Sequence, residues 1–301
     1  MAKNYGREAW QRACDLVARD HGPETTLLGG SWTVKKLYFL CAYLELFARG
    51  MGGNPKFPNG LTYVDLFCGS GITAVDDSSG RPRHYPGSAL LAASTRVESR
   101  DGQAKTFSRL VLVDKNPGSA EASGRRARGV GFEGAIEQFV ADSNSIASKI
   151  AVAIPTGSVG VAFVDPYSLD IHFETIATIA RGRQLDIIIL YSMHVDLIRN
   201  VELYYAQPNS KLDRFLGTDS DWRQAYDSLP DRSGIHVSEL FSTLYLSQLG
   251  QLGYKYADSW QLEGPKGPMF RLVFASKNPL GLKYCGIARS EDFDGQRGLF
   301  P

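Results

Sequence analysis

Short apolar runs alternate with segments of helical spacing along most of the chain. The runs that predict strands cover residues 62–67, 109–113, 159–164 and 185–191, with a weaker one at 136–141 and two late ones near 254–262 and 269–276. Apolar positions at helical spacing lie between them, over 87–98, 117–129, 144–153 and 172–181. Because these strand runs are apolar throughout, the sheet should be covered on both faces. The pattern predicts an α/β fold with a doubly wound, mostly parallel sheet.

Helical segments also precede and interrupt this alternation. Residues 7–20 and 33–49 carry apolar positions at helical spacing, and the Gly/Pro-rich stretch 50–60 separates them from the first strand. The pattern turns mostly helical again from 192 to 253. We therefore expect N-terminal helices in an extension over 1–60, a main domain over 61–285 and a C-terminal tail over 286–301. A helical insertion at about 192–253 should follow the fifth strand.

Composition and charge narrow the classes of partner. The 301 residues carry a formal net charge of +1, so a nucleic acid would have to be held by a local basic patch rather than by a global field. None of the four cysteines has a metal-ligand spacing, and the sequence predicts no metal site. The N-terminus lacks the pattern of a signal peptide, and no apolar run approaches the length of a membrane span. These features predict a cytoplasmic protein that does not enter a membrane.

The stretch TYVDLFCGSG (62–71) ends an apolar run in a carboxylate and then turns through two glycines. Taken alone, GSGITA (69–74) matches the dinucleotide pattern. In dinucleotide folds, however, a helix begins inside the glycine motif, and here the motif runs into DDSSGRPRHYPG (76–87), which cannot be helical. The ribose carboxylate should follow after about 20 residues, whereas the next strand-end acid is Asp114. The sequence therefore disfavours a nicotinamide dinucleotide.

S-adenosylmethionine fits the pattern better, because it needs close backbone contact and acceptors for an ammonium and two ribose hydroxyls. VDLFCGSG resembles motif I of Rossmann-like methyltransferases. Asp114 matches the acid that binds the ribose in that fold, and Asp142 matches the position that contacts adenine. Each also has an alternative interpretation as a helix-capping residue. The predicted cofactor-binding residues are Asp65, Phe67, Cys68, Gly69, Ser70, Gly71, Asp114, Lys115, Asp142 and Ser143.

The fourth predicted strand ends in Asp165, Pro166 and Tyr167. Methyltransferases that act on exocyclic amines carry an acid or amide, prolines and an aromatic residue here, because oxygen atoms accept the amine hydrogens while the ring stacks on the planar substrate. This chain has one proline where that motif has two, so an ordinary Asp-Pro turn stays open. Cytosine-5 methylation needs a cysteine thiolate as nucleophile in this region. It is disfavoured because no cysteine lies between 69 and 284. His172 is a candidate base at the start of the next helix.

Three further residues are candidates for substrate binding. Arg81 and Arg83 lie beside an aromatic residue next to the glycine turn, where they could clamp phosphates, although a solvated loop explains them as well. Tyr191 ends the fifth predicted strand and is a candidate for lining the same mouth. A second group of arginines, Arg125, Arg126 and Arg128, lies on the helix predicted over 117–129.

Several longer stretches resemble the three-Cys-motif partner proteins, a bacterial and phage-associated family of Rossmann-like methyltransferases. The resemblance runs through SWTVKKLYFLCAYLELF (31–47), TYVDLFCGSG (62–71), YPGSALLA (85–92), VAFVDPYSLDIHFETIATIA (161–180), VDLIRN (195–200), FLGTDSDWRQAY (215–226) and FASKNPLGLKYC (274–285). Two places depart from the family, which usually has phenylalanine at Tyr167 and Ala-Gly-Pro where this chain has Cys68-Gly-Ser.

The resemblance implies cofactor roles for Asp65, Gly69, Gly71 and Asp114, and an active-site position for Asp165-Pro166. It also implies that Gly87-Ser88 opens a helix after an inserted hairpin, so that 72–86 could act as a lid, and that a protein with three cysteines is a partner. We expect a methyltransferase (EC 2.1.1.-) acting on a nitrogen of a nucleic acid or nucleotide. A cofactor-binding partner subunit without catalysis, or a methyltransferase of a small molecule or peptide, are the alternatives.

Overall fold

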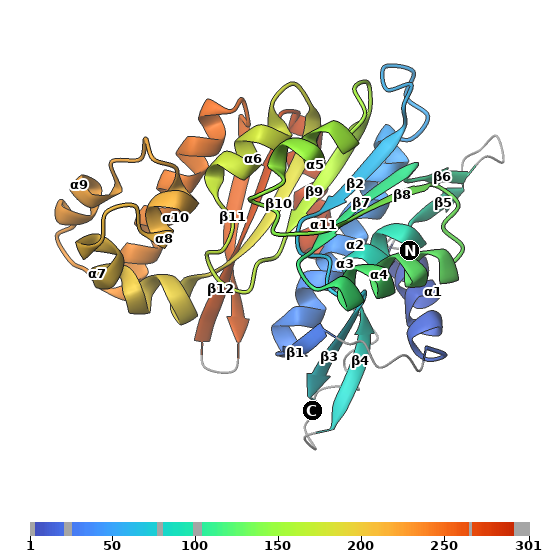
Figure 1. The fold of residues 1–301 in the computed structure, drawn as a ribbon, viewed down its shortest axis with the longest axis horizontal. Helices are drawn as coiled ribbons and strands as arrows, with labels where there is room; N and C mark the ends of the chain where they lie inside the picture. The colour runs from blue at the N-terminus through green and yellow to red at the C-terminus, as the bar shows by residue number, and fades with distance from the viewer. Residues whose placement is uncertain (1–3, 21–25, 77–80, 99–103, 265–266, 292–301) are drawn as a thin grey trace.

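A seven-stranded sheet forms the centre of the molecule (Figure 1). The computed structural model describes residues 4–20, 26–76, 81–98, 104–264 and 267–291. In spatial order the strands are β11 (Tyr256–Gly264), β12 (Gly267–Ser276), β10 (Gln184–Ser192), β9 (Val159–Val164), β2 (Leu61–Asp65), β7 (Arg109–Asp114) and β8 (Ala135–Val140). β12 pairs antiparallel with both neighbours, while the pairs from β10 to β8 are all parallel. The predicted mostly parallel, doubly wound sheet is confirmed.

Burial explains why the central strands could be predicted from the sequence. All residues of β2 and β9 are buried, which requires apolar side chains on both faces. β8 lies at the sheet edge, and its residues are exposed or half-buried. It was therefore the weaker prediction.

Helices cover both faces of the sheet. On one face α2 (Ser31–Met51), α3 (Ser88–Ser94), α4 (Pro117–Gly129) and α11 (Pro279–Ser290) contribute to a core that includes Tyr63 and Phe163. On the other face α5 (Ala147–Ala153) and α6 (Phe173–Ala180) pack with Val64 and Val164. Neighbouring strand residues thus alternate between two cores, as a sheet between helical layers requires.

A smaller sheet is added beside the N-terminal helix α1 (Arg7–Val17). β1 (Thr26–Gly29) pairs parallel with β3 (Ile72–Asp76), which pairs antiparallel with β4 (Pro82–Pro86). This places the hairpin expected within 72–86 next to the glycine turn, and Figure 1 shows it projecting away from the main sheet. The helix predicted over 87–98 ends earlier, at Ser94, because the following residues form a ribbon of β5 (Arg96–Glu98) and β6 (Ala104–Thr106).

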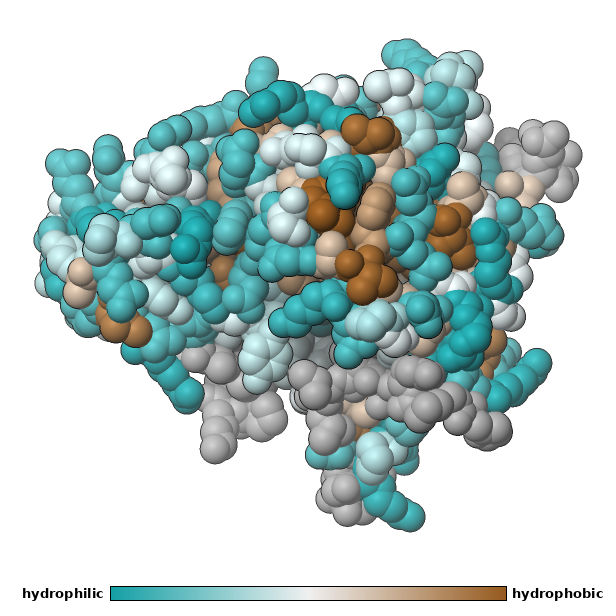
Figure 2. All heavy atoms as spheres, viewed as in Figure 1, coloured by the Kyte–Doolittle hydropathy of each residue, from teal (hydrophilic) through white to brown (hydrophobic). Residues whose placement is uncertain are grey.

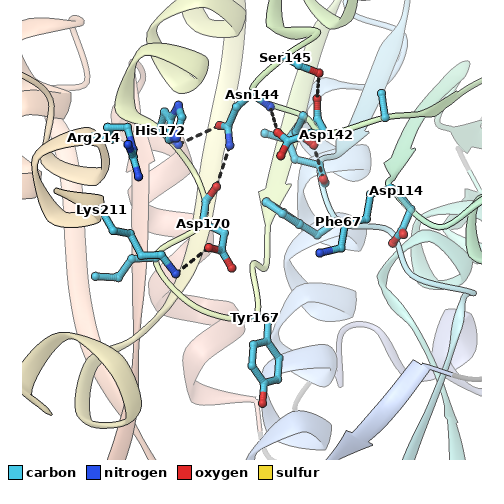
Figure 3. A pocket seen from close by; sticks show the side chains of 15 residues that line it. Phe67, Asp114, Asp142, Asn144, Ser145, Tyr167, Asp170, His172, Lys211 and Arg214 are labelled. Carbon is cyan, nitrogen blue, oxygen red and sulfur yellow. Dashed lines mark hydrogen bonds and ion pairs between the residues drawn. The ribbon is translucent and has the colours of Figure 1, made fainter. Parts of the chain in front are cut away.

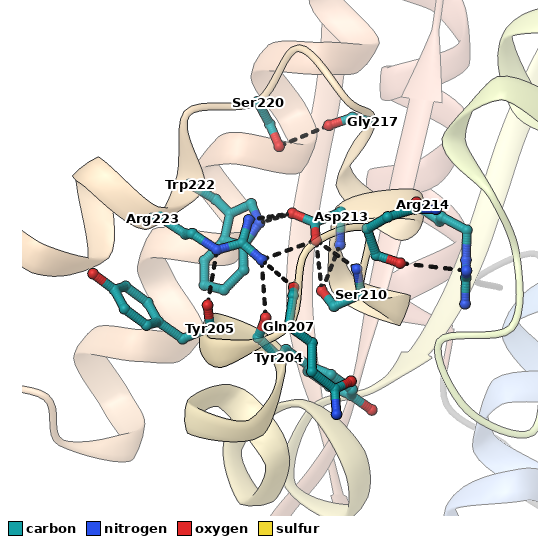
Figure 4. Close-up of polar contacts among 11 residues, drawn as sticks. Tyr204, Tyr205, Gln207, Ser210, Asp213, Arg214, Gly217, Ser220, Trp222 and Arg223 are labelled. Atoms are coloured by element: carbon teal, nitrogen blue, oxygen red, sulfur yellow. Dashed lines mark hydrogen bonds and ion pairs between the residues drawn. The ribbon is translucent and has the colours of Figure 1, made fainter.

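The predicted helical insertion is present after β10, the fifth strand of the parallel part in chain order. It consists of the π-helical segment η1 (Met193–Leu197), α7 (Ile198–Ala206), α8 (Lys211–Leu216), α9 (Trp222–Asp227) and α10 (Gly234–Gln251). Asp213 of α8 joins it together, because its carboxylate accepts hydrogen bonds from Trp222 Nε1 at 2.7 Å and Arg223 Nη1 at 2.5 Å (Figure 4). Burial alone would raise the pKa of Asp213, but hydrogen bonds from Arg223, Trp222 and Ser210 hold it below its ordinary value.

Helix α2, in the predicted N-terminal extension over 1–60, shares a hydrophobic core with β2 and β7. The predicted division of the chain at residues 60 and 285 stays a prediction. Helix α11 continues to Ser290, five residues into the predicted tail over 286–301, and residues 292–301 lie outside the described residues. No helix among the described residues is long and apolar enough to cross a membrane.

Candidate active site

The sheet has its topological switch point between β2 and β9. From β2 the chain continues to β7 and β8 on one side, and it then crosses to β9 on the other. Ligands of open α/β sheets bind outside the carboxyl ends of the strands at such a point. Asp65 and Asp114 end two of these strands, and Asp165 directly follows a third. The switch point therefore brings three predicted site residues to one edge.

The glycine turn after β2 has the backbone that its sequence requires. Gly69 and Gly71 adopt φ of +54° and +82°, a region that favours glycine. Gly87 donates its N–H to the Gly71 carbonyl at 2.7 Å, and a Cβ on Gly87 would lie 2.9 Å from the Gly71 carbonyl carbon. The loop is thus packed against the start of α3. After Gly71 the chain enters strand β3, not a helix.

A pocket of about 640 Å³ opens beside this turn, at the ends of β2, β7, β8 and β9 (Figure 3). This volume is in the range of sites that hold small molecules and cofactors. The insertion contributes Lys211 and Arg214 to its far wall. The predicted site residues that line it are Phe67, Asp114, Lys115, Asp142, Ser143, Tyr167 and His172.

Asp114 connects the pocket to the glycine turn. Its Oδ2 accepts the Gly69 N–H at 2.9 Å, and its Oδ1 accepts the Asn116 N–H at 2.8 Å. The capping role considered for Asp114 belongs to Asn116, whose side chain accepts the Ser119 N–H at 3.1 Å at the start of α4. Asp114 is half-buried and lines the pocket, and each of its carboxylate oxygens can accept a second hydrogen bond.

Asp142 and Ser143 follow β8 on the adjacent wall. Asp142 Oδ1 accepts the Asn144 N–H at 2.7 Å, which closes a turn before α5. The alternative of a plain helix cap is wrong, since α5 begins at Ala147 and Ile146 is its cap position. Ser143 is buried and donates its hydroxyl to the Leu66 carbonyl at 2.5 Å. Ser143 therefore joins the ends of β8 and β2.

Asp65 does not line the pocket, which corrects the prediction of a direct cofactor contact. Its side chain is fully buried and accepts hydrogen bonds from Ser88 Oγ at 2.6 Å, Tyr63 Oη at 3.0 Å and the Phe67 N–H at 3.3 Å. Burial raises the pKa of Asp65 to about 7, against the hydrogen bonds from Ser88 and Tyr63. Cys68 and Ser70 are also buried and lie outside the pocket lining. Asp65, Cys68 and Ser70 shape the turn. The pocket lining also excludes Gly69, Gly71, Asp165 and Pro166, whose roles stay predictions.

Asp165 forms an ion pair with Lys36 of α2, a partner 129 residues away in the sequence. The Lys36 side chain is 4% exposed and that of Asp165 is 23% exposed. The Lys36 ammonium also lies 4.9 Å from the centre of the Trp32 ring. Pro166 is buried, whereas Tyr167 is 83% exposed at the pocket rim. The segment after β9 thus presents a carboxylate, one oxygen of which is paired with a buried cation, and an exposed aromatic ring.

Sequence analysis missed Lys36, although a signal was present. Nearly every position of α2 from Thr33 to Ala48 is buried, and most of these residues are apolar. A helix of this kind is enclosed by the fold, so a lysine within it needs a buried partner.

His172 lies at the start of α6, where it was predicted, and lines the pocket. Burial, and then the nearby Arg214, lower the pKa of His172, which favours a neutral imidazole. Its backbone N–H donates to Asn144 Oδ1 at 2.9 Å, while Asn144 Nδ2 donates to the Asp170 carbonyl at 2.8 Å. The loops after β8 and β9 are therefore joined.

The insertion closes the far side of the pocket through polar contacts that the sequence did not reveal. Lys211 Nζ lies 2.8 Å from Asp170 Oδ1 and 3.7 Å from Asp196 Oδ2. Asp196 is buried and also accepts a hydrogen bond from Ser168 in the loop after β9. Lys211 and Asp196 thus link the insertion to the segment that follows Asp165.

The three predicted substrate-binding residues do not belong to the pocket lining. Tyr191 is fully buried in the core, with its ring centre 5.2 Å from that of Phe215, so the prediction that it lines the mouth is wrong. Arg81 directly precedes β4 and Arg83 lies within it, and both are exposed. Figure 2 shows the largely hydrophilic surface of this face, including the projecting hairpin. Their role in substrate binding stays a prediction.

Comparisons with known proteins identify similar folds at low sequence identity. No protein-family model matches the chain, and no curated protein matches its sequence. The family resemblance stated above therefore stays a prediction. Among the described residues, no group of three His, Cys, Asp or Glu side chains is arranged to hold a metal ion.

Three solved structures illustrate the likeness. A protein from Legionella pneumophila is 13% identical at a TM-score of 0.49, with 87% of this chain and 94% of that chain covered. The O-methyltransferase TomG from Streptomyces achromogenes, in complex with S-adenosylmethionine, is 17% identical at a TM-score of 0.41, with 90% of each chain covered. An O-methyltransferase from Bacillus cereus, in complex with S-adenosylhomocysteine, is 11% identical at a TM-score of 0.41, with 92% of each covered. Because all three TM-scores are below 0.5, the fold assignment rests on the strand order itself.

Proposed function

We propose that this protein is an S-adenosylmethionine-dependent methyltransferase (EC 2.1.1.-) whose cofactor binds in the pocket at the ends of β2, β7 and β8. One observation carries this proposal. The pocket brings two carboxylates from adjacent strand ends, Asp114 and Asp142, to the side of a left-handed glycine turn. Carboxylates suit the hydroxyl and amino groups of a nucleoside, and they would repel a phosphate.

The residues present fit the parts of this cofactor. Asp114 would accept the ribose hydroxyls, because each of its oxygens uses only one lone pair on a backbone N–H. Asp142 and the Ser143 backbone would contact the adenine, with Phe67 against an apolar face. The glycine turn would supply backbone next to the amino acid end.

A nicotinamide dinucleotide fits less well. Its pyrophosphate needs the N-terminus of a helix that begins within the glycine motif. Here strand β3 follows Gly71, and α3 begins only at Ser88. Ser88 also donates its hydroxyl to Asp65, so this helix end faces a carboxylate.

Methyl transfer would take place next to the segment Asp165-Pro166-Tyr167. The cofactor would supply a methyl group on its sulfonium: an acceptor lone pair would bond to that methyl carbon as the sulfur–methyl bond breaks, and S-adenosylhomocysteine would leave. Asp165 would accept hydrogen bonds from an acceptor nitrogen and orient that lone pair, while the exposed Tyr167 ring would stack on a planar base. These residue types favour a nitrogen of a nucleic acid or nucleotide as acceptor.

The first test is native mass spectrometry of the purified protein for retained S-adenosylmethionine or S-adenosylhomocysteine, followed by a radiolabelled methyl screen against DNA, RNA and peptides. We expect bound cofactor and label on a nucleic acid, with the label lost in Asp165→Ala. Full activity in that variant would contradict the role of Asp165. Label on peptides only would favour the small-molecule or peptide alternative. Activity that appears only after a three-cysteine protein is added would favour the partner-subunit alternative.

A further inference from the structure

Arg126 is a buried cation on α4, one of the three arginines that the proposed site does not use. Its side chain is 0% exposed. Arginine is almost never fully buried unless it is paired, because removing its charge from water is costly. Its surroundings therefore indicate what it holds in place.

One end of the guanidinium contacts the glycine turn. Arg126 Nη1 donates to the Ser70 carbonyl at 2.8 Å. Ser70 lies between Gly69 and Gly71, which both adopt left-handed backbone. Glycines give the unfolded turn a wide choice of conformations, so a hydrogen bond from a buried cation restricts it strongly.

The other side of the guanidinium binds the N-terminal segment. Arg126 Nε lies 2.8 Å from Asp20 Oδ2, and Nη2 lies 3.2 Å from Asp20 Oδ1. This is a two-point carboxylate contact, and the Asp20 side chain is only 9% exposed. Asp20 follows helix α1 and provides the charge that compensates a buried arginine.

The same turn is attached to the pocket on its opposite side. Gly69, the residue before Ser70, donates its N–H to Asp114, and Asp114 lines the pocket. A continuous series of polar contacts therefore runs from Asp20 through Arg126 and the turn to Asp114. Residues 4–20, the N-terminal part that the structure describes, do not line the pocket themselves.

We propose that Asp20 and Arg126 form a positioning pair that presets the glycine turn for S-adenosylmethionine, so that Asp20 acts on the cofactor site through the turn. Neither residue would touch the cofactor. This proposal rests on the proposed function for its ligand. Whether the pair restricts the glycine turn can be measured without any ligand.

Two variants test the pair. Arg126→Met removes the cation and the two-point contact that compensates the buried Asp20 carboxylate, a loss that can unfold the protein. The double variant Asp20→Asn/Arg126→Met removes both charges and avoids that penalty. Arg125→Met is the matched control, because Arg125 lies on the same helix and reaches Asp20 Oδ2 at 3.4 Å, but its side chain is 56% exposed.

Each variant is measured by thermal unfolding, by amide hydrogen exchange of the turn at 69–72, and by calorimetric titration with S-adenosylmethionine. The double variant should fold, exchange about tenfold faster in the turn and bind with an at least about tenfold higher Kd. Arg126→Lys should recover part of both effects, since one ammonium can keep one of the contacts. Arg125→Met should stay within about twofold of the wild type.

A folded double variant with wild-type exchange and wild-type affinity would overturn the proposal. If the wild-type protein gives no heat with S-adenosylmethionine, the proposed function and the ligand named here both fail. Faster exchange of the turn in the double variant would still establish that the pair holds the turn, and unchanged exchange would refute that as well.

Discussion

The ends of β2 and β7 lie side by side and each carries an aspartate, yet the two carboxylates are in opposite environments. Asp65 is fully buried under Ser88 and Tyr63, and its pKa is raised to about 7 by burial. Asp114 is half-buried, accepts two backbone N–H groups and lines the pocket. A strand-end acid is thus a structural group at one position and a binding group at the next.

The difference comes from what covers each strand end. β2 is flanked by β9 and β7, and the start of α3 is packed over its end through Ser88 and Gly87. β7 is followed by α4, whose cap is Asn116, and this leaves Asp114 at the pocket wall. The comparison predicts that Asp65 governs stability and that Asp114 governs binding.

The largest expected effect concerns the pH dependence of stability at Asp65. The folded-state pKa of about 7 lies above the ordinary value of 3.8, so the folded protein keeps a proton that the unfolded chain releases. The contribution of Asp65 to the free energy of unfolding should be highest below its ordinary pKa and fall as the pH rises toward 7, by about 4 kcal/mol in total at about 1.4 kcal/mol per pKa unit. Asp186, whose pKa burial raises to about 6, should add a loss of the same sign.

Urea unfolding between pH 4 and pH 8 measures this slope. Asp65→Asn should flatten the part that Asp65 contributes, since an amide does not ionise in this range. Asp186→Asn is the matched control and should leave that part in place. An Asp65→Asn variant with the wild-type slope would show that Asp65 is not the buried titrating group.

The next effect is on cofactor affinity at Asp114. Asp114→Ala should raise the Kd for S-adenosylmethionine about 10- to 150-fold, because it removes charge-assisted hydrogen bonds of about 1.5–3 kcal/mol. Asp65→Asn should change the same Kd by less than about tenfold, since Asp65 lies outside the pocket lining. Calorimetric titration at one pH compares the two. Equal losses would remove the distinction between the two strand ends.

A third strand end, that of β9, extends the comparison to a smaller effect. Lys36→Met removes the cation beside Asp165 and should lower the free energy of unfolding by about 1–2 kcal/mol. This is below the 3–5 kcal/mol typical of a fully buried pair, because the Asp165 side chain is 23% exposed. Lys35→Met, at the exposed neighbouring position, should stay within about 0.5 kcal/mol. Chemical denaturation measures the free energy of unfolding of both variants. A Lys36→Met variant as stable as Lys35→Met would show that the pair with Asp165 does not stabilise the fold.

The sequence predicted the parts of this molecule that depend on local pattern. β2, β7 and β9 were identifiable because strands buried on both faces are mostly apolar. The glycine turn was identifiable because left-handed backbone at Gly69 and Gly71 favours glycine. Asp114, Asp142 and His172 reached the pocket because parallel strands end at a common edge.

The errors arose where tertiary packing decides. Tyr191 lies near the carboxyl end of β10, at the predicted edge of the sheet, but the insertion covers it with Phe215 and Tyr245, which no local pattern shows. The helix predicted over 87–98 ends at Ser94 because the residues after it form β5. This strand has only three residues, with Val97 buried, which is too short for a recognisable pattern. The pairing of Lys36 with Asp165 joins two distant segments, so it appears only in the folded chain.

The most direct test of the central claim is a calorimetric titration of the purified protein, in parallel, with S-adenosylmethionine, S-adenosylhomocysteine and a nicotinamide dinucleotide. Two carboxylates beside a left-handed glycine turn should give saturable heat with the first two ligands and none with the third. Saturable heat with the dinucleotide alone would contradict the assignment of this pocket.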